Sequence, residues 1–540
     1  MKKMMSILLS TILAAGSLSV FAACGDRNSE DGGEAIDPNR TQLYVGVFDG
    51  ALGTEWFDLY DEAYEASHPD IQVILDEKKN EYGDAQLVST MKDSRQDVYF
   101  LSANNYSVYV DSDLLLDITD CVTEKVYDEE MNLVGAETGT KSIIDMMYPD
   151  FQKVYGIQEG ESVKYYGLPN WISPAGVIYD AGLFEDPTYG YEVPETYEEF
   201  KQLWAMMESD GITAFSFSSF DYILHSALSG VWAAYEGKAN YELNNSFSGS
   251  YTFPAGSLTS EEMTRWNGTT ESDDSQTVTI TKENAFLLQR QPGKEAALQF
   301  MYDLAHNTAY TTQGTRANQL NTNAQDEFVG SVSNPTQNRV AMLLESTYWE
   351  SEAKATIQSV GELLRDPSME YGKRDFRFMP FPKMQGSTND KTTVFCSNTS
   401  SMVCVNAATD VPDIAKDFVQ FVHDRSNLAI YTQYTSSIRP FYYEMTSAEL
   451  EKCTPFGQSI YALTQDENVE FTYDLIYSDN EITKAGGEEF MWNWKFMSDI
   501  TPPSRNPFSS FYSNQNLTVD AYWNGLKAHW SESNWQTQIR

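Results

Sequence analysis

The fold of this chain is decided between residues 42 and 101, where the sequence reads QLYVGVF (42–48), TEWFDLYDEAYEAS (54–67), IQVIL (71–75), AQLVSTMKDS (85–94) and DVYFL (97–101). The three apolar runs predict buried strands, and the two segments between them predict helices. Pro69 ends the first helix, because proline cannot continue a helical hydrogen-bond ladder. Strands that alternate with helices indicate parallel pairing, and therefore an α/β fold.

The same alternation continues along the chain. Further strands are expected at residues 176–179, 214–218, 340–345, 376–380 and 401–406. A helix begins after Thr196, because Glu199 three residues later completes a capping box, and another helix runs from Pro412 to His423. Residues 236–281 are rich in Gly, Ser, Thr and Asn, and we expect an irregular insertion or a short set of hairpins there.

The N-terminus carries an export signal. Lys2 and Lys3 precede an apolar run that ends in Ala22-Ala23-Cys24-Gly25, which predicts a signal peptide over residues 1–23. The run is too short for a permanent membrane helix. Small residues before Cys24 resemble a bacterial lipobox, so we expect a lipidated Cys24 at the head of a disordered tether over residues 24–40. An ordinary secretory signal cut nearby is the alternative.

Composition limits the classes of partner. The chain has 540 residues with a net charge of −43, so its surface repels phosphate backbones and anionic headgroups, and nucleic acid is not expected as a partner. About 500 residues follow the tether, which is too many for one hydrophobic core. Four cysteines remain after the lipid site, and their pairing is left open: Cys121, Cys396, Cys404 and Cys453.

Eight segments, the first of them already quoted, occur in a recognisable order. They are DVYFL (97–101), LLLDIT (114–119), YGLP (166–169), VIYDAGLF (177–184), VPETYEEF (193–200), RVAMLLE (339–345), FMPFP (378–382) and AKDFVQF (415–421). Together with the strand and helix of residues 43–69, this set resembles family 1 of the extracellular solute-binding proteins of bacterial carbohydrate ABC transporters, which includes maltose-binding protein. The resemblance covers most of residues 41–460.

The resemblance implies a two-lobed, periplasmic-binding-protein-like type II α/β fold with a hinge and a cleft between the lobes. Lobe 1 would comprise residues 41–172 and a return segment, 399–455, while lobe 2 would comprise 173–398 and, with the C-terminal helices, 456–540. The chain would cross between lobes near residues 170–176 and return near 396–402. The lobes would close around the ligand by a hinge motion.

The resemblance also implies a function. A monomer held on the outer face of the cell membrane by its lipid would capture a small solute, which we expect to be an oligosaccharide. It would then deliver that solute to the permease subunits of an ABC importer. No cofactor, metal or catalytic residue is expected.

Candidate ligand-binding residues follow the expected strands, because ligands of α/β sheets sit beyond the carboxyl ends of strands. Sugars present apolar faces and hydroxyl edges, so aromatic rings and planar polar groups are the side chains of interest. The candidates in the first half of the chain are Asp49, Trp56, Asn104, Asn105, Tyr106, Asn170, Trp171, Phe220 and Tyr222.

Four later residues complete the candidate site. Glu345 ends an expected strand, and Tyr348 and Trp349 come just after it, where the family places an aromatic stacking residue. A buried structural tryptophan is the alternative for Trp349. Arg439, in a loop after a helix, can donate in a fork to hydroxyls or to a carboxylate, and its alternative is a salt bridge that stabilises a lobe.

Three rival functions stay open at this point. A glycoside hydrolase would use the same aromatic and acidic residues. A binding protein for a non-sugar solute such as a peptide would share the fold. A surface adhesin or structural lipoprotein would bind no small solute. The five histidines are isolated, and the sequence contains no Gly-x-Ser-x-Gly elbow, Walker loop or dinucleotide fingerprint, which favours binding over catalysis.

Overall fold

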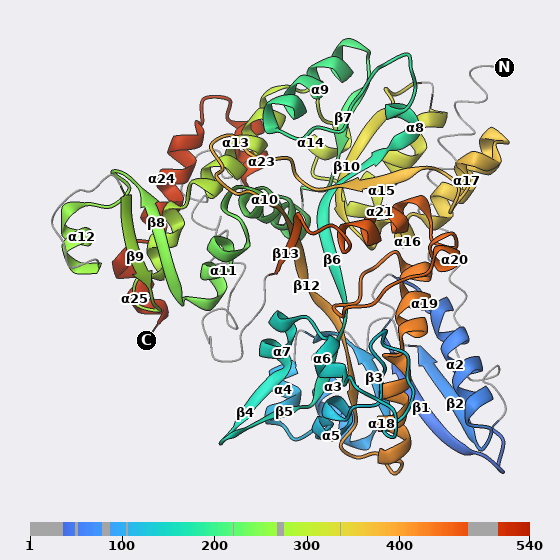
Figure 1. Cartoon of the computed structure of the whole chain (residues 1–540). Coiled ribbons are helices and arrows are strands. Elements are labelled where there is room, and N and C mark those ends of the chain that lie inside the picture. The colour runs from blue at the N-terminus through green and yellow to red at the C-terminus, as the bar shows by residue number, and fades with distance from the viewer. Residues whose placement is uncertain are drawn as a thin grey trace.

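The computed structural model describes residues 36–48, 52–77, 87–103, 106–219, 221–266, 275–334, 336–473 and 506–539. The predicted signal peptide, Cys24 and most of the predicted tether lie outside this part of the chain. Figure 1 shows the chain from its blue N-terminal strands to its red C-terminal helices. Within these ranges, no helix is long and apolar enough to cross a membrane.

Strands and helices alternate along most of the chain. The strands are β1 (Thr41–Val47), β2 (Ile71–Glu77), β3 (Val98–Leu101), β4 (Gly156–Glu159), β5 (Ser162–Tyr165), β6 (Gly167–Asp180), β7 (Thr213–Ser216), β8 (Gly249–Pro254), β9 (Ser275–Ile280), β10 (Val340–Ser346), β11 (Phe376–Met379), β12 (Thr392–Val405) and β13 (Val469–Tyr473).

The helices before residue 300 are α2 (Glu55–Ser67), α3 (Leu87–Thr90), α4 (Tyr106–Asp111), α5 (Thr119–Thr123), α6 (Ile143–Met146), α7 (Pro149–Tyr155), α8 (Ala181–Phe184), α9 (Tyr197–Ser209), α10 (Asp221–Glu236), α11 (Lys238–Ser246), α12 (Ser260–Trp266) and α13 (Pro292–His306). Those after it are α14 (Gln313–Arg316), α15 (Asn321–Gly330), α16 (Trp349–Glu352), α17 (Lys354–Leu364), α18 (Pro412–Val422), α19 (Arg425–Thr435), α20 (Ser447–Leu450), α21 (Pro455–Leu463), α23 (Pro507–Ser513), α24 (Val519–His529) and α25 (Glu532–Gln538).

The main sheet has the strand order β2-β1-β3-β12-β6-β10-β7. In its first part, β1 pairs in parallel with β2 and β3, as the opening stretch of sequence predicts. In its second part, β10 pairs in parallel with β7 and antiparallel to β6. Strand β6 joins the two parts, since its residues 167–174 pair with β12 and its residues 175–179 pair with β10. Figure 1 shows β6 and β12 running between the lower and upper parts of the molecule.

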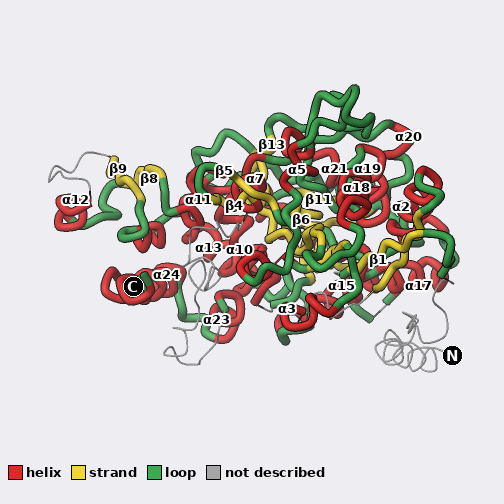
Figure 2. Tube along the Cα trace, turned by 90° about the horizontal axis from the view of Figure 1, so that it is seen from below, coloured by secondary structure: helices red, strands yellow, loops and turns green. Residues whose placement is uncertain are grey.

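Two hydrophobic cores flank this junction. One core is centred on β1, β2, β3 and the segments after residue 394, where it includes Trp56, Tyr60 and Tyr431, and it extends through Phe328 and Trp349 to α15 and α16. The other is built on β7, β10, α9, α10 and α13, and it includes Trp204 and Trp232. Figure 2 shows strands of the main sheet in the middle of the molecule with helices on both sides, and the strands β8 and β9 near one edge. A chain of this length divides its apolar side chains between two cores, as expected.

The elements agree with the sequence, apart from three differences in extent. The capping box of Thr196 and Glu199 is present at the start of α9. The expected strands at 176–179 and 401–406 are the ends of much longer strands, β6 and β12. Prolines in β6 and serines in β12 interrupt the apolar pattern, so the sequence does not indicate the full length of either strand. The second expected helix is only one turn, α3, followed by a 3₁₀ turn. Residues 236–281 include the hairpin β8–β9.

Candidate functional site

Loops and helix starts converge where β6 passes from one part of the sheet to the other. The carboxyl ends of β7 and β10 lie on this side, at Ser216 and Ser346, and α10 packs across β6, β10 and β12. The loop after α19 is hydrogen-bonded to β6, because the N–H of Ile172 donates to the carbonyl oxygen of Ile438 at 2.9 Å. In α/β sheets such a junction is where ligands bind.

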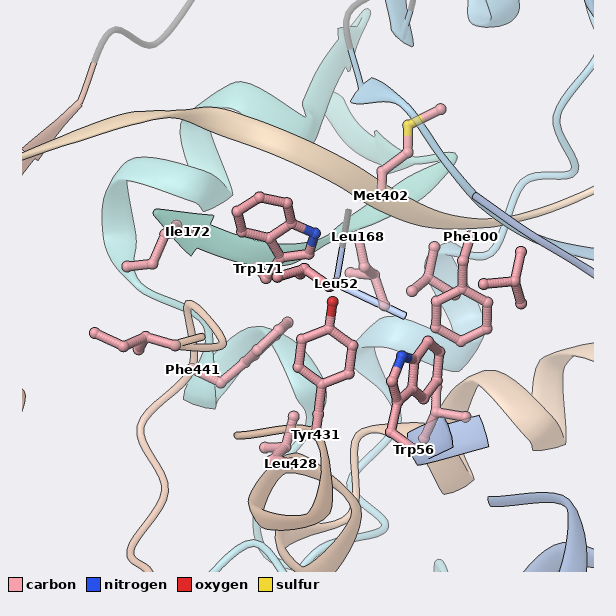
Figure 3. Packing of buried hydrophobic residues seen from close by; sticks show 14 of the residues in the cluster. Leu52, Trp56, Phe100, Leu168, Trp171, Ile172, Met402, Leu428, Tyr431 and Phe441 are labelled. Atoms are coloured by element: carbon pink, nitrogen blue, oxygen red, sulfur yellow. The ribbon is translucent and has the colours of Figure 1, made fainter. Parts of the chain in front are cut away.

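A group of polar and aromatic side chains lies at this junction: Trp56, Tyr60, Asn170, Tyr431 and Arg439, here called the Tyr431 cluster. The ring of Tyr431 lies 4.9 Å from that of Trp56, edge to face, and 5.0 Å from the guanidinium carbon of Arg439. The amide nitrogen of Asn170 donates to the hydroxyl of Tyr431 at 3.5 Å. Figure 3 shows the indoles of Trp56 and Trp171 turned toward Tyr431.

Several polar atoms of the Tyr431 cluster are buried without hydrogen-bond partners within the described residues. They are Oδ1 of Asn170 and both Nε and Nη2 of Arg439. The remaining terminal nitrogen of Arg439 donates to the hydroxyl of Tyr60 at 3.5 Å. A buried polar atom without a partner costs about 1–3 kcal/mol, and a ligand group that bonded to it would remove that cost.

The charge of Arg439 also acts on its surroundings. Burial lowers the pKa of the His423 imidazole to about 3, and the nearby guanidinium of Arg439 adds to the fall. Nδ1 of His423 bonds to the carbonyl oxygen of Val419 at 2.7 Å. His423 is therefore neutral at physiological pH, and Arg439 supplies the positive charge at this place.

A small pocket lies further along β6, between β6, β10 and α10. Its lining residues are Ala175, Gly176, Ser226, Ala227 and Glu345, and its volume of about 10 Å³ is enough for one water-sized group. Burial raises the pKa of the Glu345 carboxyl to about 8, and the neighbouring carboxylate of Glu352 adds to the rise. The carboxyl group is therefore protonated at neutral pH, and one of its oxygens accepts a hydrogen bond from the N–H of Ser346 at 3.1 Å.

The segment after β10 is tied to the loop that carries Arg439. Glu350 accepts hydrogen bonds from the hydroxyls of Ser436 and Thr454, both at 2.8 Å. Burial raises the pKa of the Glu350 carboxyl to about 7. Thr347 and Ser173 share a hydrogen bond of 3.0 Å between their hydroxyls, which fixes the start of this segment against β6.

The structure brings together some of the predicted site residues and separates others. Trp56, Asn170 and Arg439 meet at Tyr431, and Trp171 lies beside them. Glu345 and Tyr348 lie next to each other, one at the pocket and one after β10. Tyr106 is elsewhere in the first core, where its hydroxyl donates to the carbonyl oxygen of Tyr155 at 2.9 Å.

Of the two residues given a structural alternative, Trp349 occupies a position that matches that alternative, and Arg439 does not. Trp349 has no exposed surface, and its indole packs against Phe328, Phe376 and Phe456. Its role as a stacking platform stays a prediction. Arg439 forms no salt bridge within the described residues and is held instead by aromatic rings and the Tyr60 hydroxyl.

Some predicted site residues cannot be placed. Asp49, Asn104, Asn105 and Phe220 lie outside the described residues, as does the side chain of Tyr222. They stay predictions.

Sequence reasoning missed Tyr431, Tyr60, Ser226 and Ala227. Tyr60 and Tyr431 lie in the helices α2 and α19, where an aromatic residue reads as ordinary core. Ser226 and Ala227 lie in α10, eight and nine residues beyond the end of the expected strand at 214–218 that drew attention to Phe220 and Tyr222. No spacing in the sequence marks these four positions.

Within the described ranges, no three His, Cys, Asp or Glu side chains gather as a metal site would require. The four cysteines after residue 100 are all buried and unpaired in the structure.

The long strand β6 joins two parts of one sheet, and a pocket lies where it crosses. Polar groups without partners lie near this crossing. These features are typical of two-lobed ligand-binding proteins. Residues 60–453 match the family model of the bacterial extracellular solute-binding proteins, and the chain belongs to this family. The predicted family, the fold class and the extracytoplasmic location are thereby confirmed. No curated protein matches the sequence.

Solved structures share the fold at low sequence identity. The apo form of RafE from Streptococcus pneumoniae aligns with a TM-score of 0.56 and 12% identity, over 93% of this chain and 100% of that one. A probable secreted solute-binding lipoprotein from Streptomyces coelicolor aligns with a TM-score of 0.57 and 11% identity, over 91% and 99%. Maltose-bound T. maritima MalE3 aligns with a TM-score of 0.53 and 12% identity, over 91% and 99%.

Proposed function

We propose that this protein captures an oligosaccharide outside the cell, where β6 passes from one part of the sheet to the other, and delivers it to an ABC importer. The observation that carries the proposal is the Tyr431 cluster. There Asn170 and Arg439 hold buried polar atoms without partners beside the indoles and phenols of Trp56, Trp171 and Tyr431. Hydroxyl groups of a sugar would satisfy those atoms, and its apolar ring faces would lie against the aromatic rings.

Structural neighbours support a sugar as the ligand. RafE in complex with raffinose, a chitin oligosaccharide binding protein and maltose-bound MalE3 have the same fold as this chain. The identities of 12 to 14% show the fold alone. The proposal that this chain binds a sugar therefore depends on the side-chain chemistry of the Tyr431 cluster.

The working cycle follows from the crossing strands. Residues 41–172 and 399–455 would form one lobe, and residues 173–398 and 456–540 the other. A ligand that touches both lobes stabilises the closed state by its differential affinity for it. The closed, loaded form is the state that the importer would recognise.

The remaining features of the proposal concern the N-terminus and assembly. Cleavage before Cys24 and acylation of its thiol would tether a monomer to the outer face of the membrane. Replacing Cys24 by serine is expected to release the protein into the medium, as measured by immunoblot of cell and medium fractions. Retention of the C24S protein in the membrane fraction would contradict the anchor.

The direct test is binding. Saturating ligand raises the free energy of unfolding by RT ln(1 + [L]/Kd), about 2.7 kcal/mol at a hundredfold excess over Kd. Maltotriose, raffinose, chitotriose and short peptides are offered to the purified protein, and thermal unfolding is followed. We expect a saccharide to raise the melting temperature; a shift with peptides alone would support the peptide binder instead.

The hydrolase alternative is tested with the same purified protein. The protein is incubated with the saccharide that binds, and reducing ends are counted over time. We expect no release beyond a control without protein, because we infer that the protein binds without catalysis. Turnover of many sugar molecules per protein would identify a glycoside hydrolase.

A further inference from the structure

We propose that two lysines of lobe 2 set the ligand affinity of this protein in opposite directions. Lys354, paired with Glu55 of lobe 1, favours closure around the ligand, and Lys238, paired with Asp150 of lobe 1, opposes it. This inference rests on the proposed capture of a ligand between the two lobes. It assigns the balance between the open and closed forms to two ion pairs.

The first ion pair joins the lobes beside the Tyr431 cluster. Nζ of Lys354 lies 2.9 Å from Oε1 of Glu55. Glu55 begins α2, and the next residue, Trp56, belongs to the Tyr431 cluster. Lys354 begins α17, which packs against α15, and α15 packs against β7 and β10 in the second part of the sheet. A contact between the lobes at the ligand site is shortest when the lobes are closed, so this pair stabilises the closed form.

The second ion pair joins the lobes at another place. Nζ of Lys238 lies 2.6 Å from Oδ2 of Asp150. Asp150 lies in α7, which contributes to the core of β1, β2 and β3, and Lys238 begins α11, which contributes to the core of β7, β10 and α10. The side chains of Lys238 and Asp150 are 30% and 11% exposed, against 50% and 57% for Lys354 and Glu55. The second pair is therefore less screened by water and salt.

Helix α11 is fixed at this contact by strand β13. The backbone N–H of Lys238 donates to Oε1 of Glu470 at 2.8 Å, and the side-chain amide of Asn245 donates to the carbonyl oxygen of Tyr473 at 2.9 Å. The ring of Tyr473 lies 4.9 Å from that of Phe151 in α7, edge to face. Since β13 pairs with β12, α11 and α7 meet across a strand of the crossing.

Both lysines occupy positions that the helix dipole disfavours. Lys238 and Lys354 are the first residues of α11 and α17, where a positive charge faces the positive end of the dipole. Glu55 and Asp150 lie in the first turns of α2 and α7, where a carboxylate is favourable. Each lysine is thus stabilised by a carboxylate of the other lobe and not by the dipole of its own helix.

The two ion pairs lie on opposite flanks of the crossing. In Figures 1 and 2, α7 and α11 are on one side of β6, and α2 and α17 are on the other. A hinge motion about the crossing strands brings the lobes together on one flank and draws them apart on the other. Closure on a ligand at the Tyr431 cluster therefore keeps the contact of Lys354 and breaks that of Lys238.

The test measures Kd by calorimetry at pH 7 for the tightest binder among maltotriose, raffinose and chitotriose. Lys354→Met is expected to raise Kd about threefold, because it removes a contact of the closed form. Lys238→Met is expected to lower Kd about threefold, because it removes a contact that closure must break. Asp150→Asn is expected to act in the same direction as Lys238→Met, although it keeps the contact of Lys238 with Glu242 at 3.5 Å.

Lys164→Met is the matched control. Lys164 lies 2.7 Å from Asp117, both within lobe 1, and its side chain is 32% exposed, close to the value for Lys238. This change is expected to leave Kd as in the wild type. Exchanging the charges of the first pair, as E55K with K354E, is expected to restore the wild-type Kd, which side-chain shape alone would not do.

Salt gives a second readout. The three sugars are uncharged, so salt acts only on the charges of the protein. The exposed pair of Lys354 and Glu55 is screened more than the partly buried pair, so wild-type Kd is expected to rise about twofold between about 0.05 and about 0.5 M sodium chloride. Lys354→Met is expected to lose this rise.

X-ray scattering tests the same balance without a sugar. Lys238→Met is expected to have a smaller radius of gyration than the wild type, and Lys354→Met a larger one. If a saccharide binds but the two variants shift Kd in the same direction, or not at all, the ion pairs do not control closure and sugar binding stands. If no saccharide binds the wild type, the sugar proposal fails; opposite changes in radius would still support the two ion pairs, and equal radii would overturn them.

Discussion

The side-chain amide of Asn170 lies 3.5 Å from the hydroxyl of Tyr431, so the strand that joins the two parts of the sheet is linked directly to helix α19, 261 residues later in the chain. The other amide atom, Oδ1, has no hydrogen-bond partner within the described residues. Asn170 is thus both a structural link and a group able to receive a ligand.

Replacing Asn170 by alanine is expected to weaken binding of the saccharide about fivefold, because a hydrogen bond in a buried site contributes about 1 kcal/mol. Calorimetric titration at pH 7 measures the change. Asn244→Ala is the control: Asn244 is buried with an unpartnered Oδ1 of its own, but it bonds to Tyr241 and Gln291 in the other core. It is expected to lower stability without changing Kd. Equal losses of affinity in the two variants would remove Asn170 from the site.

Trp349→Ala is expected to lower the free energy of unfolding by about 3–5 kcal/mol, because it leaves a cavity among Phe328, Phe376 and Phe456. Urea unfolding followed by circular dichroism gives the change. Trp349→Phe keeps part of the ring volume and is expected to cost less. A W349A protein that unfolds at the wild-type urea concentration and yet has lost its sugar would show that the indole is a stacking platform after all.

Gly230→Ala is expected to destabilise the protein by about 1–3 kcal/mol, since the new methyl group overlaps the ring of Phe381 and this exceeds the gain of about 1 kcal/mol in helix propensity. Gly330→Ala is the matched control, because Gly330 is also helical and a Cβ there meets nothing within 4 Å. It is expected to be neutral or slightly stabilising. Adding Phe381→Leu should restore part of the loss in G230A; purely additive effects would contradict the contact.

Asp180→Asn is expected to cost about 3–5 kcal/mol at pH 7, because it leaves the buried guanidinium of Arg374 without its counter-charge. Burial alone would raise the pKa of Asp180, but the guanidiniums of Arg374 and Arg339, at 2.8 and 2.6 Å, hold it below its usual range. A lowered pKa stabilises the fold above the unfolded value of about 4 and does so less as the pH falls below it.

Urea unfolding from pH 7 to pH 3 should therefore show the difference between wild type and D180N shrinking at the acid end. Asp186→Asn, at a half-buried carboxylate six residues further on that accepts a hydrogen bond from the Thr188 N–H at 2.9 Å, is expected to change the unfolding curve much less, because the amide oxygen of asparagine can still accept that bond. A difference that stays constant with pH would show that Asp180 acts through shape and not through charge.

The order of strands and helices in the first 60 residues of the folded part could be predicted well, because β1, α2, β2 and β3 are short, local and strongly patterned. Strand β6 was predicted only in part. Its sequence, GLPNWISPAGVIYD, contains two prolines and alternates poorly, and it is a strand because β12, β10 and β11 pair with it. Long-range pairing, which no local pattern records, decided its length.

The candidate site divides in the same way. Trp56, Asn170 and Arg439 were found from the sequence because each follows a strand or helix end. Tyr431 and Tyr60 were not, since a phenol inside a helix looks the same whether it faces the core or a ligand. Trp349 was predicted as a platform, and its full burial among three phenylalanines could not be foreseen from one chain position.

The sequence by itself determined the α/β class, the export signal expected at the N-terminus and the acidic character of the surface, because each depends on neighbouring residues or on totals. Only the tertiary structure decided which aromatic rings are core, which polar atoms lack partners, and that Glu345 faces a pocket walled by Ala175 and Ala227. The reason is physical: burial and pairing arise between segments hundreds of residues apart, and their energies depend on distances that chain order does not fix.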